Sequence, residues 1–365
     1  TSSTMRQSIL ILLLGDLGDA ILTLPAIHAL RERYPSRRLL LMAKQSTGAY
    51  IRDLCLVDEV IEVDKHALDR IGVLANARAV LRIAKLVRRL RHEDIQSLFV
   101  FQHLSTRWGA LKFGLLAGVS GAGERFGLDN GRGWFLTHAV RDRGFGAVHE
   151  AAYWLEVAGL AGAAADSAPR AHVHGHDRQD ADRLLRAVGT GDRAILAVHP
   201  GVGWYGPGRQ WGAERFAQAA RLILDACDMD CLVVGTEADR EPADALAVAL
   251  GQRARSIVGE TNVLQLAAVL ERCSLVLSND SGVAHLAAAV GAPTLTVFGP
   301  SNDAAWRPLG GQIAAASIPC RPCFYRDFEI GLRQGCATRE CLALVTPQAV
   351  ARQGLALLEG RRVAV

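Results

Sequence analysis

The stretch that decides the fold is "SLVLSNDSGVAHLAAAVGAPTLTVFGP", from Ser274 to Pro300. An apolar run ends in the polar turn Asn279–Gly282, an alanine-rich helical segment follows, and a second apolar run closes the stretch. Fully apolar strands that alternate with helices are typical of a parallel sheet covered on both faces. The stretch therefore predicts an α/β protein.

The same alternation runs through the chain twice. Strands are expected at "SILILLL", "RRLLLMA", "VDEVIEVD" and "IQSLFVF", with helices over 20–33 and 71–91. After a change in composition over 159–192, the pattern restarts at "AILAVHPG" and ends in a helix over 347–358. This predicts two doubly wound Rossmann-like domains, at 1–170 and 171–345, followed by a terminal segment at 346–365. Ligands bind outside the carboxyl ends of such strands, so we expect the two sets of ends to face one cleft.

The composition excludes several classes of protein. The 365 residues are 50% hydrophobic and 21% charged, with a net charge of +4, which is too mild for a typical nucleic-acid binder. No stretch approaches the roughly 18 apolar residues of a membrane span, and "SILILLL" is too short for a signal peptide, so we expect a cytoplasmic protein. Residues 1–156 hold 21 Lys and Arg against 16 Asp and Glu. This basic half suits an anionic acceptor or a membrane surface, or is simply a solvated basic face.

The turn after the strand at Leu275 has the features of an anion site. Free N–H groups at Ser281, Gly282 and Val283 would point at a phosphate, and the helix dipole would strengthen the attraction. His285 lies on the first helical turn and could face the same anion. An ordinary helix N-cap by Asp280 or Ser281 explains the turn equally well.

Two other turns carry charged groups suited to a nucleotide. In "HPGVGWYGPGRQWGAERF" (199–216), Arg209 follows a glycine-rich loop that begins at Gly201, and a guanidinium suits a diphosphate. In "VVGTEADRE", Glu237 follows a strand, where a carboxylate can accept hydrogen bonds from ribose hydroxyls. The alternatives are a surface arginine and a helix-capping acid.

Taken together, these turns resemble glycosyltransferase family nine, the heptosyltransferases. The matching pieces are "GDLGDAILTLPAIHALRERYP", "HPGVGWYGPGRQWGAERF", "NDSGVAHLAAAVGAPTLTVFGP" and "WRPLG", which span residues 15–310. The resemblance implies a GT-B fold whose terminal helix crosses back to the first domain. It also implies an inverting, metal-independent transfer of heptose from a nucleotide-heptose, usually ADP-heptose, to a lipopolysaccharide core sugar, without a catalytic cofactor. Contact with the cytoplasmic face of the inner membrane would follow from a glycolipid acceptor.

The resemblance also assigns roles to residues. Asp19 corresponds to the catalytic base, Asp16 shapes or caps the turn, and Gly15 and Gly18 let the turn approach the acceptor. Arg209 stands where the family has a phosphate-contacting lysine, a departure that keeps the charge but changes its geometry. The expected donor-binding residues are Gly201, Arg209, Glu237, Thr261, Asp280, Ser281, Gly282 and His285.

Four of the eight cysteines crowd into 22 residues, at Cys320, Cys323, Cys336 and Cys341. In a cytoplasmic protein this spacing favours a metal over disulfides. Four thiolates suit a structural zinc or an iron site, and free thiols are the alternative. One branch of the family, the autotransporter heptosyltransferases, binds iron through such cysteines and glycosylates protein side chains.

Other functions are compatible with these residues. The acceptor could be a protein side chain or a natural product instead of a lipopolysaccharide core. A NAD-dependent dehydrogenase would also have Rossmann-like domains. A non-catalytic sugar-nucleotide binder is the third possibility, and the presence of Asp19 with the whole donor motif argues against it.

Overall fold

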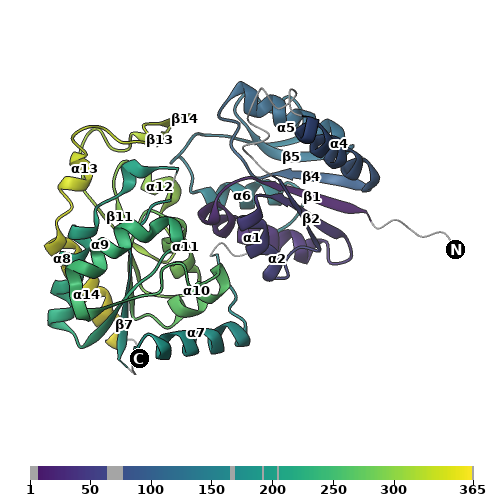
Figure 1. Cartoon of the computed structure of the whole chain (residues 1–365). Coiled ribbons are helices and arrows are strands. Elements are labelled where there is room, and N and C mark those ends of the chain that lie inside the picture. The colour runs from purple at the N-terminus through teal and green to yellow at the C-terminus, as the bar shows by residue number, and fades with distance from the viewer. Residues whose placement is uncertain (1–6, 64–76, 165–168, 191–192, 204, 364–365) are drawn as a thin grey trace. The chain divides into compact units, whose positions relative to one another are not determined.

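The computed structural model describes residues 7–63, 77–164, 169–190, 193–203 and 205–363. The chain forms two compact units (Figure 1). Unit 1 comprises Thr1–Arg143 and Glu150–Ser167, and unit 2 comprises Gly144–His149 and Ala168–Val365. Each unit has its own six-stranded sheet, flanked by helices.

The sheet of unit 1 is wholly parallel and has the order β3-β2-β1-β4-β5-β6. This is the Rossmann order, in which the direction of winding reverses between β1 and β4. The strands are β1 (Ser8–Leu13), β2 (Arg38–Ala43), β3 (Glu59–Glu62), β4 (Ile95–Val100), β5 (Glu124–Asp129) and β6 (His138–Arg141). The helices are α1 (Leu17–Arg33), α2 (Gln45–Asp53), α4 (Ala77–His92), α5 (Arg107–Ser120) and α6 (Glu150–Gly159).

The sheet of unit 2 repeats this topology, with the order β12-β11-β10-β7-β8-β9 and its reversal between β7 and β10. Its strands are β7 (Ala194–His199), β8 (Met229–Val233), β9 (Ala254–Ser256), β10 (Leu275–Asn279), β11 (Thr294–Phe298) and β12 (Gln312–Ala315). A separate two-stranded hairpin joins β13 (Phe324–Arg326) to β14 (Glu329–Gly331).

Unit 2 has helices of several lengths around this sheet. The longer ones are α7 (Gly175–Ala187), α8 (Ala213–Ala226), α9 (Arg240–Leu250), α10 (Val263–Glu271), α11 (Gly282–Ala289) and α14 (Pro347–Val363). The shorter ones are η2 (Pro207–Arg209), η3 (Glu237–Asp239), η4 (Gly251–Arg253), α12 (Asp303–Trp306) and α13 (Glu340–Ala343).

The apolar strands form the core of each unit, as their sequences require. Every residue of β1 and of β10 is buried, because both faces of each sheet are covered. This arrangement confirms the predicted α/β class with two Rossmann-like sheets. Within the described residues, no helix is both long enough and apolar enough to cross a bilayer.

Some boundaries differ from the sequence prediction. Helix α1 begins at Leu17, three residues early, because Asp16 takes the N-cap position and brings Asp19 into the first turn. Helix α4 begins at Ala77, and 71–76 of the predicted helix lie outside the described residues. The terminal helix α14 packs on α8 and β10, and Val350 lies in the core of unit 2. That this helix also crosses back to the first domain stays a prediction.

Candidate active site

Asp19 lies just beyond the carboxyl end of β1, at the point where the unit 1 sheet reverses its winding. The backbone N–H of Asp16 donates to Asp19 Oδ2 at 2.7 Å, and the Asp16 side chain pairs with Lys44. Burial, together with the nearby Asp16 carboxylate, raises the pKa of Asp19 to about 6. A carboxyl group with this pKa is poised to accept a proton near neutral pH.

The two glycines of this turn differ in what they contribute. A Cβ on Gly15 would lie 2.3 Å from the Cβ of Asp19, so only glycine fits there. The carbonyl of Gly15 also accepts a hydrogen bond from Thr47 Oγ1 at 3.0 Å. Gly18 lies in the first turn of α1 and is partly exposed. The packing thus explains why residue 15 is glycine, whereas the acceptor roles of Gly15 and Gly18 both stay predictions.

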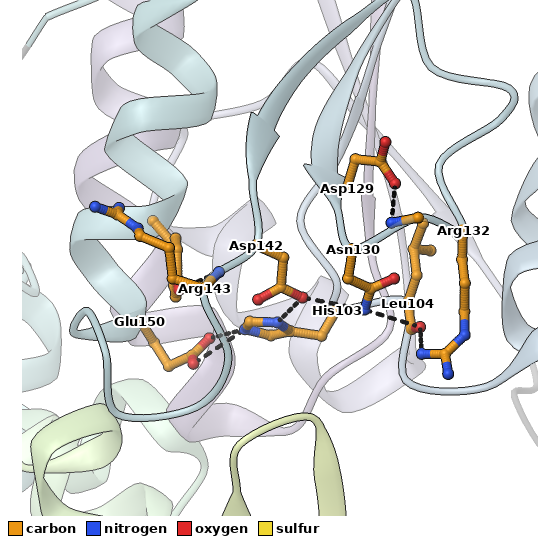
Figure 2. A network of polar contacts seen from close by, with 10 residues as sticks. His103, Leu104, Asp129, Asn130, Arg132, Asp142, Arg143 and Glu150 are labelled. Carbon is orange, nitrogen blue, oxygen red and sulfur yellow. Dashed lines mark hydrogen bonds and ion pairs between the residues drawn. The ribbon is translucent and has the colours of Figure 1, made fainter.

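A buried ionic network lies in the same unit, and sequence reasoning missed it. Figure 2 shows the His103 ring between two carboxylates: Nδ1 is 3.0 Å from Asp142 Oδ2, and Nε2 is 3.0 Å from Glu150 Oε2. Burial lowers the pKa of His103, but the two carboxylates outweigh burial and raise it to about 10. His103 is therefore an imidazolium at neutral pH. Asn130 Nδ2 lies 3.3 Å from the same Asp142 oxygen.

In unit 2, the turn after β10 has the backbone expected of an anion site. Ser281 is the N-cap of α11, and its side chain makes no capping hydrogen bond. Within the described part of the chain, no acceptor is bonded to the N–H groups of Gly282 and Val283. Their N–H groups are therefore available to a ligand at the positive end of the helix dipole.

Arg209 and Asp280 meet beside this turn. Arg209 Nη1 is 3.4 Å from Asp280 Oδ2, and Nη2 donates to the carbonyl of Val202 at 3.0 Å. Asp280 is buried, and its Oδ2 also accepts from Ser301 Oγ at 2.5 Å. The structure therefore brings the predicted Arg209 and Asp280 together, with the guanidinium held by its own loop.

His285 is buried on the first turn of α11. Burial lowers its pKa to about 4, so the ring is neutral at neutral pH and cannot attract an anion by charge. Its Nδ1 has no hydrogen-bond partner within the described residues. A buried ring nitrogen without a partner is costly, which is the usual sign that something else binds it.

The glycine-rich loop after β7 is fixed by residues that the sequence did not single out. A Cβ on Gly201 would lie 1.9 Å from Asp239 Oδ1, so the loop passes directly over that carboxylate. His199 Nδ1 is 3.1 Å from Ser281 Oγ, which ties the end of β7 to the start of α11. Burial raises the pKa of Asp239, but hydrogen bonds from His199 and Thr236 lower it to about 2. The position of Gly201 is therefore set by the ionised, hydrogen-bonded carboxylate of Asp239.

Glu237 and Thr261 lie on neighbouring loops of unit 2. Glu237 is largely exposed and forms an ion pair with Arg240, whose Nε donates to Glu237 Oε1 at 2.9 Å. A Cβ on Gly259 would lie 2.7 Å from Glu237 Oε2, so this carboxylate covers the loop that leads to Thr261. Thr261 is partly exposed, directly before the N-cap of α10. Their donor-binding roles remain predictions.

The predicted metal site is not supported. Cys320, Cys323, Cys336 and Cys341 line one small pocket, but Cys341 is buried while Cys320 and Cys336 are exposed. Among the residues with described positions, no three or more His, Cys, Asp or Glu side chains are arranged to hold a metal ion. Cys336 Sγ lies 3.5 Å from Thr338 Oγ1 instead. The spacing of the four cysteines was compatible with a metal, but it does not bring the thiols into a ligand set.

The comparison with known proteins identifies the family. Residues 83–330 match glycosyltransferase family 9 (heptosyltransferase), so the chain belongs to this family. It is 29% identical over 124 residues to lipopolysaccharide heptosyltransferase 2 of Escherichia coli K12, covering 33% of this chain. The aligned part spans about a third (35%) of that relative's length.

Two solved structures are similar over nearly the whole chain. The E. coli ADP-heptose lps heptosyltransferase II has a TM-score of 0.73 at 20% identity, covering 98% of this chain and 100% of its own. The E. coli heptosyltransferase WaaC with ADP has a TM-score of 0.68 at 16% identity, covering 96% and 100%. At these identities the likeness establishes the fold, which is GT-B.

Proposed function

We propose that this protein is an inverting glycosyltransferase that moves a heptose from ADP-heptose to a hydroxyl group of a lipopolysaccharide core or related glycan. Asp19 would take the proton of the acceptor hydroxyl as its oxygen attacks the anomeric carbon. The bond from that carbon to the diphosphate oxygen would break on the opposite face, and ADP would leave. The anomeric carbon of the transferred heptose would then have the inverted configuration. The observation that carries the proposal is a carboxylate of raised pKa at the right place. The Asp19 side chain is held beyond the end of a strand, where such folds bind their ligands.

The donor side of the proposal rests on unit 2. The leaving diphosphate carries negative charge, which Arg209 and the N–H groups at the start of α11 could balance. The Nδ1 atom of His285, which has no hydrogen-bond partner within the described residues, would make a further hydrogen bond to the bound nucleotide-sugar. Because these groups supply the stabilisation themselves, we propose that the transfer needs no divalent cation.

The nucleotide of the donor is proposed from the comparisons and the site. Of the two similar E. coli structures, one is an ADP-heptose lps heptosyltransferase and the other is a heptosyltransferase with ADP, and both share this fold. In this chain, Glu237 covers the loop before Thr261, which would place a carboxylate and a hydroxyl near a ribose and its base. We therefore favour ADP over other nucleotides.

Product analysis tests this function. The protein would be mixed with ADP-heptose and deacylated lipopolysaccharide core, with and without EDTA, and the product examined by mass spectrometry and by NMR of the anomeric proton. We expect one added heptose of inverted configuration and an unchanged rate in EDTA. Hydrolysis without transfer, retained configuration, or loss of activity in EDTA would each refute the corresponding part of the proposal.

We also propose that the face formed by α4 and α5 lies on an anionic membrane, where a glycolipid acceptor would be found. These neighbouring helices contain eight Lys and Arg and no Asp or Glu. The outer face of α5 is apolar, with Trp108, Leu111 and Leu115 all exposed. Trp134 is 69% exposed and packs over Gly114 of the same helix. Exposed aromatic and apolar side chains amid basic residues are typical of contact with an anionic bilayer surface.

Vesicle flotation tests this contact. We expect the protein to float with vesicles that contain phosphatidylglycerol but not with pure phosphatidylcholine. Leu115→Glu should abolish flotation while transfer to the soluble, deacylated acceptor persists. Leu222→Glu serves as the control, because Leu222 is also exposed (40%, against 60% for Leu115) but lies on α8 of unit 2. Flotation that survives Leu115→Glu would contradict this assignment of the surface.

A further inference from the structure

The network around His103 draws its members from three separate parts of unit 1 (Figure 2). His103 follows β4, Asp142 follows β6, and Glu150 is the first residue of α6. The Asp142 and Glu150 side chains are almost wholly buried, and that of His103 is 9% exposed. Since burying ionised groups is costly unless they are paired, three such groups meeting at one place call for an explanation beyond packing.

Within this network one imidazolium faces two buried carboxylates. The rings of Tyr153 and Trp154, 5.5 and 5.6 Å from the His103 ring, form apolar walls beside it. Such surroundings reduce the screening of the charges, and their effect therefore extends to neighbouring groups.

The neighbouring group that matters is Asp19. Helix α1, which carries Asp19, packs along α6, which begins at Glu150. The charged groups that face Asp19 are Asp16 in its own turn, Glu150 on α6 and Lys44 after β2. Of these, Glu150 is the one that the His103 ring contacts directly, through both carboxylate oxygens at 3.0 and 3.1 Å.

We propose that His103 and Glu150 are positioning residues for the transfer, because their ion pair fixes the Glu150 carboxylate and sets the charge that Asp19 experiences. The inference rests on the proposed role of Asp19 as the base. His103 partly neutralises Glu150, which lets Asp19 ionise at a lower pH than it otherwise would. Glu150 acts in the opposite direction and keeps Asp19 basic. Neither side chain needs to touch the substrate.

The pH dependence of kcat/KM tests the proposal, since a merely structural role would not move it in a defined direction. In His103→Gln, an unscreened Glu150 should move the acidic limb to higher pH by about half a unit or more. In Glu150→Gln, the limb should move to lower pH by a similar amount. The double variant should lie between the two single variants. Single variants that fold normally but leave the limb in place, or shift it in the same direction, would overturn the proposal.

A control and a second measurement keep the test decisive. His138→Gln removes an exposed histidine from the neighbouring strand β6 and should leave the profile unchanged. If His103→Gln does not fold, histidine-selective NMR of the wild-type chain decides, with the His103 signal assigned through its change in Glu150→Gln. We expect that ring to stay doubly protonated from about pH 6 to 8. Titration of the ring near its ordinary value would overturn the proposal.

The failure of this inference is distinct from failure of the proposed function. Asp19→Asn should be inactive whether or not His103 and Glu150 tune the base. If Asp19→Asn is inactive and both limbs stay in place, only the positioning role is lost. If Asp19→Asn keeps full activity, the base itself has been assigned wrongly.

Discussion

The backbone N–H of Asp16 donates a 2.7 Å hydrogen bond to Oδ2 of Asp19, which fixes the carboxylate at the first turn of α1. The same bond is part of the capping box at the start of α1, so the Asp19 side chain both stabilises the helix end and supplies the proposed base. Burial nevertheless raises the pKa of Asp19 to about 6, which shows that its ionised form is disfavoured in the folded protein.

This relationship predicts that Asp19→Asn stabilises the protein. The folded-state pKa of about 6 lies above the ordinary value of 3.8, so ionisation of Asp19 costs stability above pH 6 and costs nothing below about pH 4. Asparagine keeps an oxygen for the Asp16 N–H but carries no charge. We expect a gain of about 3 kcal/mol in the free energy of unfolding at about pH 8 and almost none at about pH 4. Urea unfolding at the two pH values measures it, and an equal gain at both would contradict the account.

His103→Gln should destabilise the protein with the opposite dependence on pH. The pKa of His103 is raised from 6.5 to about 10, so its contribution is complete below 6.5 and disappears as the pH rises through 10. The variant removes the imidazolium that faces two buried carboxylates, at a cost of about 3 kcal/mol near pH 6. Thermal unfolding should therefore show a larger loss at about pH 6 than at about pH 10. A loss that does not vary with pH would mean that His103 is not an imidazolium in the fold.

Replacing Arg209 should weaken binding of ADP. A charged hydrogen bond to a diphosphate is worth about 1.5–3 kcal/mol, so Arg209→Ala should raise the Kd about 10- to 100-fold. Arg209→Lys should lose less affinity for ADP, because lysine keeps the positive charge and loses only the bidentate hydrogen bonding of the guanidinium. Isothermal titration calorimetry measures both, with Arg193→Ala, a largely exposed arginine of unit 2, as control. Unchanged affinity in Arg209→Ala would remove this residue from the donor site.

The cysteines should differ in reactivity. The hydrogen bond from Thr338 lowers the pKa of the exposed Cys336, whereas burial raises the pKa of Cys231 and Cys273 to about 12. Iodoacetamide should therefore modify Cys336 early and the two buried thiols last, because the thiolate is the reactive form. Peptide mass spectrometry would follow the order. If Cys336 reacts only after EDTA is added, a bound metal protects it, and the structural interpretation of this segment is wrong.

The sequence was sufficient to predict the α/β architecture and the turns at the strand ends, but not the buried polar network behind them. The apolar strands and their glycine turns follow local rules, so the central strands of both sheets and the positions of Asp19 and Ser281 at strand ends could be predicted. The outer strands β5, β6 and β12 were not predicted. His103, Asp142 and Glu150 share no motif, because only the tertiary fold brings the ends of β4 and β6 and the start of α6 together.

In unit 2, too, contacts that depend on the tertiary fold could not be predicted from local sequence. Glu237 was found because it lies in a recognisable turn, but it is exposed and paired with Arg240. The buried carboxylate of this turn is Asp239, two residues further, which supports Gly201 from below the loop. Local sequence does not distinguish the two acids, since only packing across strands decides which one is buried. The four cysteines illustrate the converse, a suggestive spacing that the backbone does not bring into a ligand set.

The central claim is that Asp19 is the base of a heptose transfer, and one comparison tests it most directly. Transfer from ADP-heptose to deacylated core would be measured for Asp19→Asn and for Asp228→Asn, a control at an exposed aspartate of unit 2, with ADP affinity determined on the same samples. We predict that Asp19→Asn loses transfer by a factor of at least about 100 while binding ADP normally, and that Asp228→Asn is unchanged. Full transfer by Asp19→Asn would contradict the account.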